Sequence, residues 1–123
     1  VHKLNNLIWV WSAATLEWAD DFEDYYVGPD RADVIAIDIY NNRYEQDYHD
    51  RLVQLADGKP IAIGENGELP SVELLENDQS QYVWFMTWAE MLEKNNTADQ
   101  VQALYADDRI LTRDELKKLM KGK

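Results

Sequence analysis

The fold of this chain is decided by the stretch Val34-Ile35-Ala36-Ile37-Asp38-Ile39-Tyr40, an almost continuous apolar run that ends in polar side chains. Strands that are covered on both faces of a parallel sheet have such runs, whereas strands with one solvated face alternate between apolar and polar residues. We therefore expect a buried strand here. Three further segments have the composition of strands: Leu7–Trp11, Ile61–Ile63 and Tyr82–Met86.

Helix-compatible stretches separate these strands. The clearest is Tyr44–Asp57, in which apolar side chains recur at helical spacing and Gly58 stands where the helix would end. Thr112 and Glu115 form a capping-box pattern that predicts a last helix through Met120. The weaker helical segments are Thr15–Asp24, Ser71–Glu76 and Ala98–Tyr105.

The order is four βα units with no sign of a linker or repeat, which predicts an α/β fold with a parallel sheet and right-handed crossovers. Two architectures fit this order: an open doubly wound sheet, or an arc of a βα barrel. The chain has 123 residues and forms one domain, 1–123, about half the size of a complete barrel. It opens at Val1 without a Met, so we expect it to be cut from a longer protein.

Charge and composition exclude several classes of function. A formal charge of -12 repels phosphate backbones and anionic membrane surfaces, so we expect neither nucleic acid nor membrane as a partner. Five Trp and seven Tyr suit a surface that stacks on sugar rings, although for any single Trp a position in the core is the more frequent case. Cysteine is absent, and His2 and His49 follow no ligand pattern, so we expect no metal or cofactor and place both histidines at the surface.

Polar side chains stand at the carboxyl end of the second predicted strand, where βα enzymes build their sites. Because side chains alternate along a strand, Asp38 and Tyr40 share a face with Val34 and Ala36. The opposite face consists of isoleucines and suits packing against helices. Asp38 and Tyr40 are therefore expected to point towards the mouth of a barrel.

Glu65 closes the third predicted strand and lies between glycines in Ile-Gly-Glu-Asn-Gly. Glycine lets a strand bend where it delivers a reactive group. Counting alternation back from Glu65 places Ile61 and Ile63 on its inward face, and Ala62 and Gly64 towards the helices. The two carboxylates and the tyrosine would then converge above one interior. Alternatively, both carboxylates only cap strand ends or nearby loops.

Six motifs in order resemble the second half of family 26 glycoside hydrolases, enzymes built on a (β/α)8 TIM barrel. The resemblance covers essentially the whole chain, as strands five to eight of that barrel. It implies a half barrel that contains about the last four βα units. The motifs are Leu7–Ser12, Tyr25–Asp30, Asp33–Tyr40, Lys59–Gly67, Trp84–Trp88 and Asp108–Leu116.

The resemblance implies a retaining hydrolase of β-1,4-mannan or a related β-glycan, acting outside the cytoplasm as a secreted, periplasmic or cell-surface enzyme. By position, Glu65 would be the nucleophile and Tyr40 would hydrogen-bond and orient it. Asp38 would lie beside it in the sugar subsite, Trp88 would form the stacking floor and Trp11 would line the cleft. The reaction uses no cofactor.

The mechanism also needs a second carboxyl group, roughly 5–5.5 Å from the nucleophile. The resemblance places it at the end of the fourth barrel strand, in an Arg-x-x-x-His-Glu-like stretch that this chain does not contain. We therefore expect the chain alone to be inactive. A non-catalytic carbohydrate-binding or degenerate barrel domain, and a structural α/β domain, are the alternatives.

Half of a barrel exposes its two edge strands and its inward face. This predicts association, either as a homo-oligomer through the exposed edges or with the missing amino-terminal half.

Overall fold

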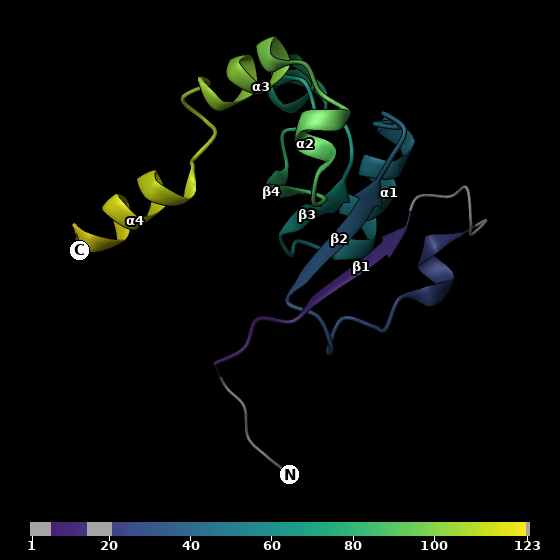
Figure 1. The fold of residues 1–123 in the computed structure, drawn as a ribbon. Coiled ribbons are helices and arrows are strands. Elements are labelled where there is room, and N and C mark those ends of the chain that lie inside the picture. The colour runs from purple at the N-terminus through teal and green to yellow at the C-terminus, as the bar shows by residue number, and fades with distance from the viewer. Residues whose placement is uncertain (1–5, 15–20, 123) are drawn as a thin grey trace.

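The computed structural model describes residues 6–14 and 21–122 and contains one sheet of four parallel strands (Figure 1). The strands lie in chain order, so each crossover connects immediate neighbours. A doubly wound sheet reverses its strand order at a switch point, and this sheet does not. The architecture is therefore the arc expected of half a (β/α)8 barrel. The strands are β1 (Val10–Ala14), β2 (Val34–Ile39), β3 (Ile61–Asn66) and β4 (Tyr82–Thr87).

Three of these strands match the predicted segments closely, but β1 does not. It runs from Val10 to Ala14, so both of its ends lie three residues further along the chain than predicted. The prediction started too early because it included Leu7 and Ile8, which are apolar but exposed and precede the strand. Ser12 is consequently a strand residue, paired with Ala36.

The helices follow the predicted order with local differences. Residues 15–20 of the predicted helix Thr15–Asp24 lie outside the described residues, and its remainder lies partly in a 3-10 turn. The helix predicted at Ser71–Glu76 is mainly a π-helix in the structure, and it lies a few residues further along the chain. The expected capping box at Thr112 forms, and the structure adds a second one at Thr97, the N-cap of the helix that begins at Ala98. The elements are η1 (Phe22–Tyr25), α1 (Gln46–Ala56), η2 (Leu74–Asp78), α2 (Met91–Lys94), α3 (Ala98–Tyr105) and α4 (Arg113–Lys121).

The α1 helix ends as the sequence predicts. Its last helical residue is Ala56, after which Asp57 and Gly58 take positive φ angles of 48° and 85°. Left-handed backbone at the end of a helix is the usual position for glycine, because a side chain there is strained. The reversal turns the chain directly into β3 through Lys59 and Pro60.

The main core lies between the sheet and α1. Ile35, Ile37 and Ile39 of β2 are buried against Tyr48 and Leu52 of α1, which confirms the predicted helix-facing side of β2. Apolar burial of this kind stabilises the layer by about 25 cal/mol for each Å² removed from water. The opposite side, called here the inner face, carries a small separate cluster of Val34, Ala36 and Ala62.

The predicted facing of β3 is wrong. Ile61 and Ile63 belong to the core against α1, and Ala62 belongs to the inner face. The reason is a bulge: Ile37 pairs with Ile63, but Asp38 pairs with Glu65, so Gly64 is an extra residue. Counting alternation through a bulge inverts every assignment before it.

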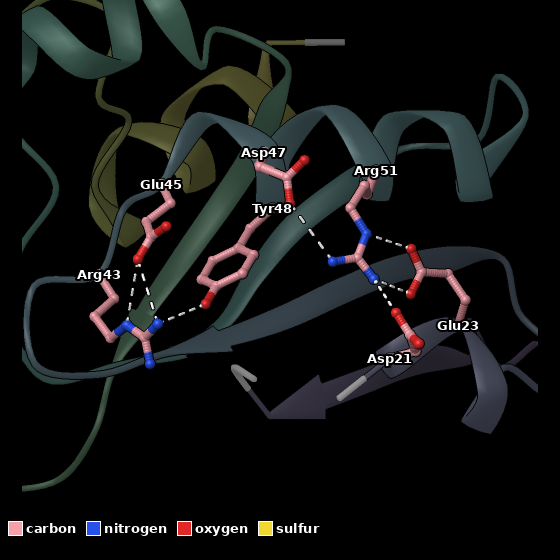
Figure 2. Close-up of polar contacts among 7 residues, drawn as sticks. All are labelled: Asp21, Glu23, Arg43, Glu45, Asp47, Tyr48 and Arg51. Carbon is pink, nitrogen blue, oxygen red and sulfur yellow. Dashed lines mark hydrogen bonds and ion pairs between the residues drawn. The ribbon is translucent and has the colours of Figure 1, made fainter. Parts of the chain in front are cut away.

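An arginine on α1 holds η1 against this core (Figure 2). Arg51 donates from Nε and a terminal nitrogen to the two carboxylate oxygens of Glu23, at 2.7 and 2.5 Å, and it also contacts Asp21 and Asp47. Its guanidinium lies 4.7 Å from the centre of the Phe22 ring, which is fully buried. The hydrogen bonds from Arg51 lower the pKa of Glu23. This cluster fixes the segment that follows β1.

The edge strands are poorly covered, whereas the expected exposure of the inward face is wrong for β2 and β3, whose Val34, Ala36 and Ala62 are buried. The β4 side chains Val83, Trp84 and Met86 are exposed, unlike the buried residues of β2. In Figure 1, α4 stands away from the sheet, and it buries none of its residues. Within the described ranges, no helix is long and apolar enough to cross a membrane.

Candidate active site

Three strands bring polar side chains together at their carboxyl ends, on the inner face. Tyr40, directly after β2, donates a hydrogen bond from its hydroxyl to Glu65 Oε2 on β3, at 2.7 Å. Ser12 on β1 donates from Oγ to Asp38 Oδ1 on β2, at 2.6 Å. The strand order therefore places two hydrogen-bonded pairs side by side across β1, β2 and β3.

Glu65 reaches this cluster only because of the bulge at Gly64. In a regular strand, Glu65 would follow Ile61 and Ile63 towards α1, where an ionised carboxylate in an apolar core would be costly. The extra residue instead pairs Glu65 with Asp38 and turns it towards Tyr40. Bulges commonly redirect a side chain next to an active site.

Tyr40 is built to remain a hydrogen-bond donor. Burial, together with its hydrogen bond to Glu65 and the charges of Glu65 and Asp38, raises the pKa of Tyr40 well above its usual range. The phenol therefore stays protonated throughout the acidic and neutral pH range. Glu65 is half-buried and accepts this proton donor on one oxygen.

Asp38 is held by the side chain of Ser12 on the neighbouring strand β1. Burial raises the pKa of Asp38, and the charge of Glu65 raises it further, while the hydrogen bond from Ser12 lowers it. The backbone N–H of Glu65, which pairs with Asp38 in the β2–β3 register, also lowers the pKa of Asp38.

A buried amide behind Glu65 fixes the loop that follows β3. Asn66 is fully buried and donates from Nδ2 to the Glu68 carbonyl at 2.7 Å and to Tyr44 Oη at 3.2 Å. Tyr44 donates in turn to the same Glu68 carbonyl. The backbone carbonyl of Asn66 accepts a hydrogen bond from the backbone N–H of Trp88 at 2.8 Å. This network fixes the backbone on either side of Glu65 and connects it to the end of β4.

The structure separates the two tryptophans that the sequence assigned to the site. Trp88 follows β4 and is 46% exposed, so its ring is available to a ligand. Trp11 packs on the opposite side, against the core cluster and edge-on to Tyr26 at 5.2 Å. Trp11 therefore does not line the cleft. Because β1 extends past Trp11, the residue of β1 that points to the site is Ser12.

Ser12 is the residue that reasoning from the sequence missed. The signal for it was indirect: Ser12 follows the apolar run, and Gly64 has no side chain to occupy the same space. Recognising the pair requires the register of β1 and β3 across β2, which the sequence alone does not provide.

Other parts of the chain offer less. A cavity of about 750 Å³ between β4 and residues 105–113 contains none of these polar groups. His49 is 4% exposed and packs edge-on to Tyr82, so the prediction of a surface position is wrong; α1 turns it towards β4. His2 lies outside the described residues. Within residues 6–14 and 21–122, no cluster of three histidine or carboxylate side chains is placed to hold a metal ion.

Comparison with known proteins identifies the family of the chain. The family model of glycosyl hydrolase family 26 matches residues 1–115. A mannan endo-1,4-beta-mannosidase of Thermothelomyces thermophilus is 31% identical over 121 residues, which cover 94% of this chain and 24% of that protein.

Solved structures show the same relation. GH26A from a Muricauda species is 42% identical with a TM-score of 0.84, over 90% of this chain and 38% of that one. The GH26-CBM35 beta-(1,4)-mannanase of Podospora anserina is 32% identical with a TM-score of 0.76, over 93% of this chain and 26% of that one. The chain thus spans about a quarter to two fifths of these proteins. It belongs to glycosyl hydrolase family 26.

Proposed function

We propose that this chain is the part of a retaining β-1,4-mannan hydrolase that carries the nucleophile, Glu65. The observation that supports this most directly is the 2.7 Å hydrogen bond from Tyr40 to a carboxylate redirected by a strand bulge. A carboxylate held by one donor keeps its other oxygen free to react. The substrate class follows the relatives, whose names identify them as enzymes acting on mannan.

In this mechanism, Glu65 attacks the anomeric carbon as the glycosidic oxygen leaves, and a glycosyl ester forms on the carboxylate. A second carboxyl group protonates the leaving oxygen and then takes a proton from the water that hydrolyses the ester. Tyr40 orients the nucleophile, Asp38 lies in the sugar subsite, and the exposed ring of Trp88 forms its stacking floor.

The chain by itself is proposed to be inactive, because Asp38 cannot serve as the second carboxyl group. Asp38 lies directly opposite Glu65 on the neighbouring strand, and its carboxylate accepts the hydrogen bond from Ser12. The acid and base would come from a preceding half of the barrel, with this chain supplying strands five to eight. Light scattering tests the related expectation that the isolated chain associates through its open edges. A stable monomer at micromolar concentration would contradict it.

Covalent labelling tests the assignment of Glu65. The full-length protein that contains this chain is treated with an activated 2-deoxy-2-fluoro-mannoside, digested, and analysed by peptide mass spectrometry. We expect one mannosyl group, on the peptide with Glu65, and neither label nor mannan hydrolysis in Glu65→Gln.

Glu73→Gln is the matched control, because Glu73 is an exposed carboxylate remote from the inner face. It should label and hydrolyse as the unchanged protein does. Label on another residue, or full hydrolysis by Glu65→Gln, would overturn the assignment. Mannan binding without hydrolysis by the full-length protein would instead identify a non-catalytic domain. We also propose that the parent protein acts outside the cytoplasm, and mannan hydrolysis by the culture medium or by intact cells would test this.

A further inference from the structure

Ser12, Asp38 and Gly64 meet at a point where three strands leave no spare room. A Cβ atom built on Gly64 would lie 2.2 Å from Ser12 Oγ and 2.7 Å from Asp38 Oδ1. These are the two atoms that form the 2.6 Å hydrogen bond between Ser12 and Asp38. Any side chain at position 64 would therefore displace that hydrogen bond.

Backbone conformation does not explain the glycine. Among the described glycines, Gly28 and Gly58 have positive φ angles and Gly64 does not. Any residue can adopt the Gly64 dihedral angle, so the requirement at this position is space. The space is taken up by the hydroxyl of Ser12.

The Ser12 hydroxyl donates to the Asp38 carboxylate, and Asp38 pairs with Glu65, the proposed nucleophile, in the β2–β3 register. Asp38 is half-buried, and the titratable groups that face it are Glu65 on β3 and Tyr40 at the end of its own strand. Ser12, on β1, is the uncharged donor among its neighbours. Because Asp38 pairs with Glu65 at the bulge and its carboxylate lies directly beside Gly64, the position of Asp38 and that of the bulge are linked.

We propose that Ser12 is a positioning residue of this site: its hydroxyl, admitted by the absence of a side chain at Gly64, holds the Asp38 carboxylate beside Glu65, its partner in the β2–β3 register. The effect on catalysis rests on the proposed function, whereas the contact between Ser12, Asp38 and Gly64 does not. Removing the hydroxyl loosens Asp38, and adding a methyl group at position 64 expels the hydroxyl.

The first test observes Asp38 directly. The full-length protein, labelled with [γ-13C]aspartate, is titrated by NMR, and the Asp38 signal is identified by its loss in Asp38→Asn. The variants Ser12→Thr and Ser12→Val have nearly the same shape and differ in the hydroxyl. We expect Ser12→Thr to keep the original midpoint and Ser12→Val to raise it by roughly half a pH unit, as the pair borders solvent. Equal midpoints in Thr and Val would overturn the proposal.

The second test is a double-mutant cycle on mannan hydrolysis. Ser12→Ala is expected to lower kcat roughly threefold to tenfold and to move the acidic limb of the pH profile upward, because Asp38 loses a donor to its ionised form. Gly64→Ala should lower kcat further. In Ser12→Ala/Gly64→Ala the losses should be less than additive, since the closest clash is gone. Additive losses, or an unchanged kcat in Gly64→Ala, would refute the claim that the Ser12–Asp38 hydrogen bond requires the absence of a side chain at position 64.

The two tests separate two failures. If the unchanged protein hydrolyses no mannan, the proposed function is wrong, and the NMR titration still decides whether Ser12 holds Asp38. If mannan is hydrolysed and the Thr and Val variants behave alike in both tests, the function stands and the role of Ser12 is wrong.

Discussion

Replacing Tyr40 by Phe removes a single hydroxyl and tests how Glu65 is held. The aromatic ring stays in place, so packing after β2 should be unchanged. What is lost is the 2.7 Å hydrogen bond to Glu65 Oε2. Because the pKa of Tyr40 is raised, the hydroxyl is a donor throughout the acidic and neutral range, and its loss should be felt at every working pH.

The size of the effect follows from the kind of hydrogen bond and its exposure. A hydrogen bond to a charged group contributes about 1.5–3 kcal/mol. Tyr40 and Glu65 are both half-buried, so solvent screening places this one near the lower end. Because about 1.4 kcal/mol corresponds to a factor of ten, we expect kcat on mannan to fall about tenfold.

The assay compares initial rates of mannan hydrolysis by the full-length protein and its variants. Tyr26→Phe is the matched control, because the buried hydroxyl of Tyr26 has no hydrogen-bond partner among the described residues. It should leave kcat unchanged. An unchanged kcat in Tyr40→Phe, with the same circular dichroism spectrum as the original protein, would refute the orienting role.

Three further predictions concern stability and binding. The hydroxyl of Tyr82 is buried without a partner among the described residues, so Tyr82→Phe should raise the free energy of unfolding by about 1 kcal/mol in urea denaturation. Glu23→Gln should destabilise the protein at neutral pH but not at acidic pH: because Arg51 lowers the pKa of Glu23 below its ordinary 4.5, this contribution is present above 4.5 and is lost as pH falls through the lowered value. Urea curves at both pH values would measure the difference. Trp88→Ala should raise KM about tenfold with little change in melting temperature, since the ring is 46% exposed, and a large drop in melting temperature would contradict this.

Much of the architecture follows from local pattern. The β2 run could be recognised as a buried strand because its residues are buried on both faces. Its isoleucines lie in the core with α1, and Val34 and Ala36 pack with Ala62 on the inner face. The helix Ala98–Tyr105 was predicted to the residue, and its N-cap Thr97 closes a capping box with Gln100. These features depend on neighbours within a few positions, which is why the sequence contains them.

The errors come from places where tertiary contacts decide. The first strand was predicted to begin too early because Leu7 and Ile8 are apolar. Hydrophobicity alone does not distinguish the exposed segment before a strand from the strand itself. His49 was placed at the surface because a lone histidine has no periodic signature, and its burial depends on contact with Tyr82 of β4. Trp11 was placed in the cleft because the strand was thought to end there.

The bulge in β3 explains why alternation counted back from Glu65 assigned the rest of the strand to the wrong face. Counting back from Glu65 by twos put Ile61 and Ile63 on the inner face, whereas both lie in the core. The assumption that failed was regular alternation at Gly64, where one residue of β2 spans two of β3. A larger residue at that position would meet Ser12 and Asp38 at once. The glycine therefore serves as the extra residue that turns Glu65 to the site and as the gap that lets Ser12 reach Asp38. The position of Glu65, the proposed nucleophile, consequently depends on the residue before it, and a side chain at position 64 should disturb the bulge and the Ser12–Asp38 hydrogen bond together.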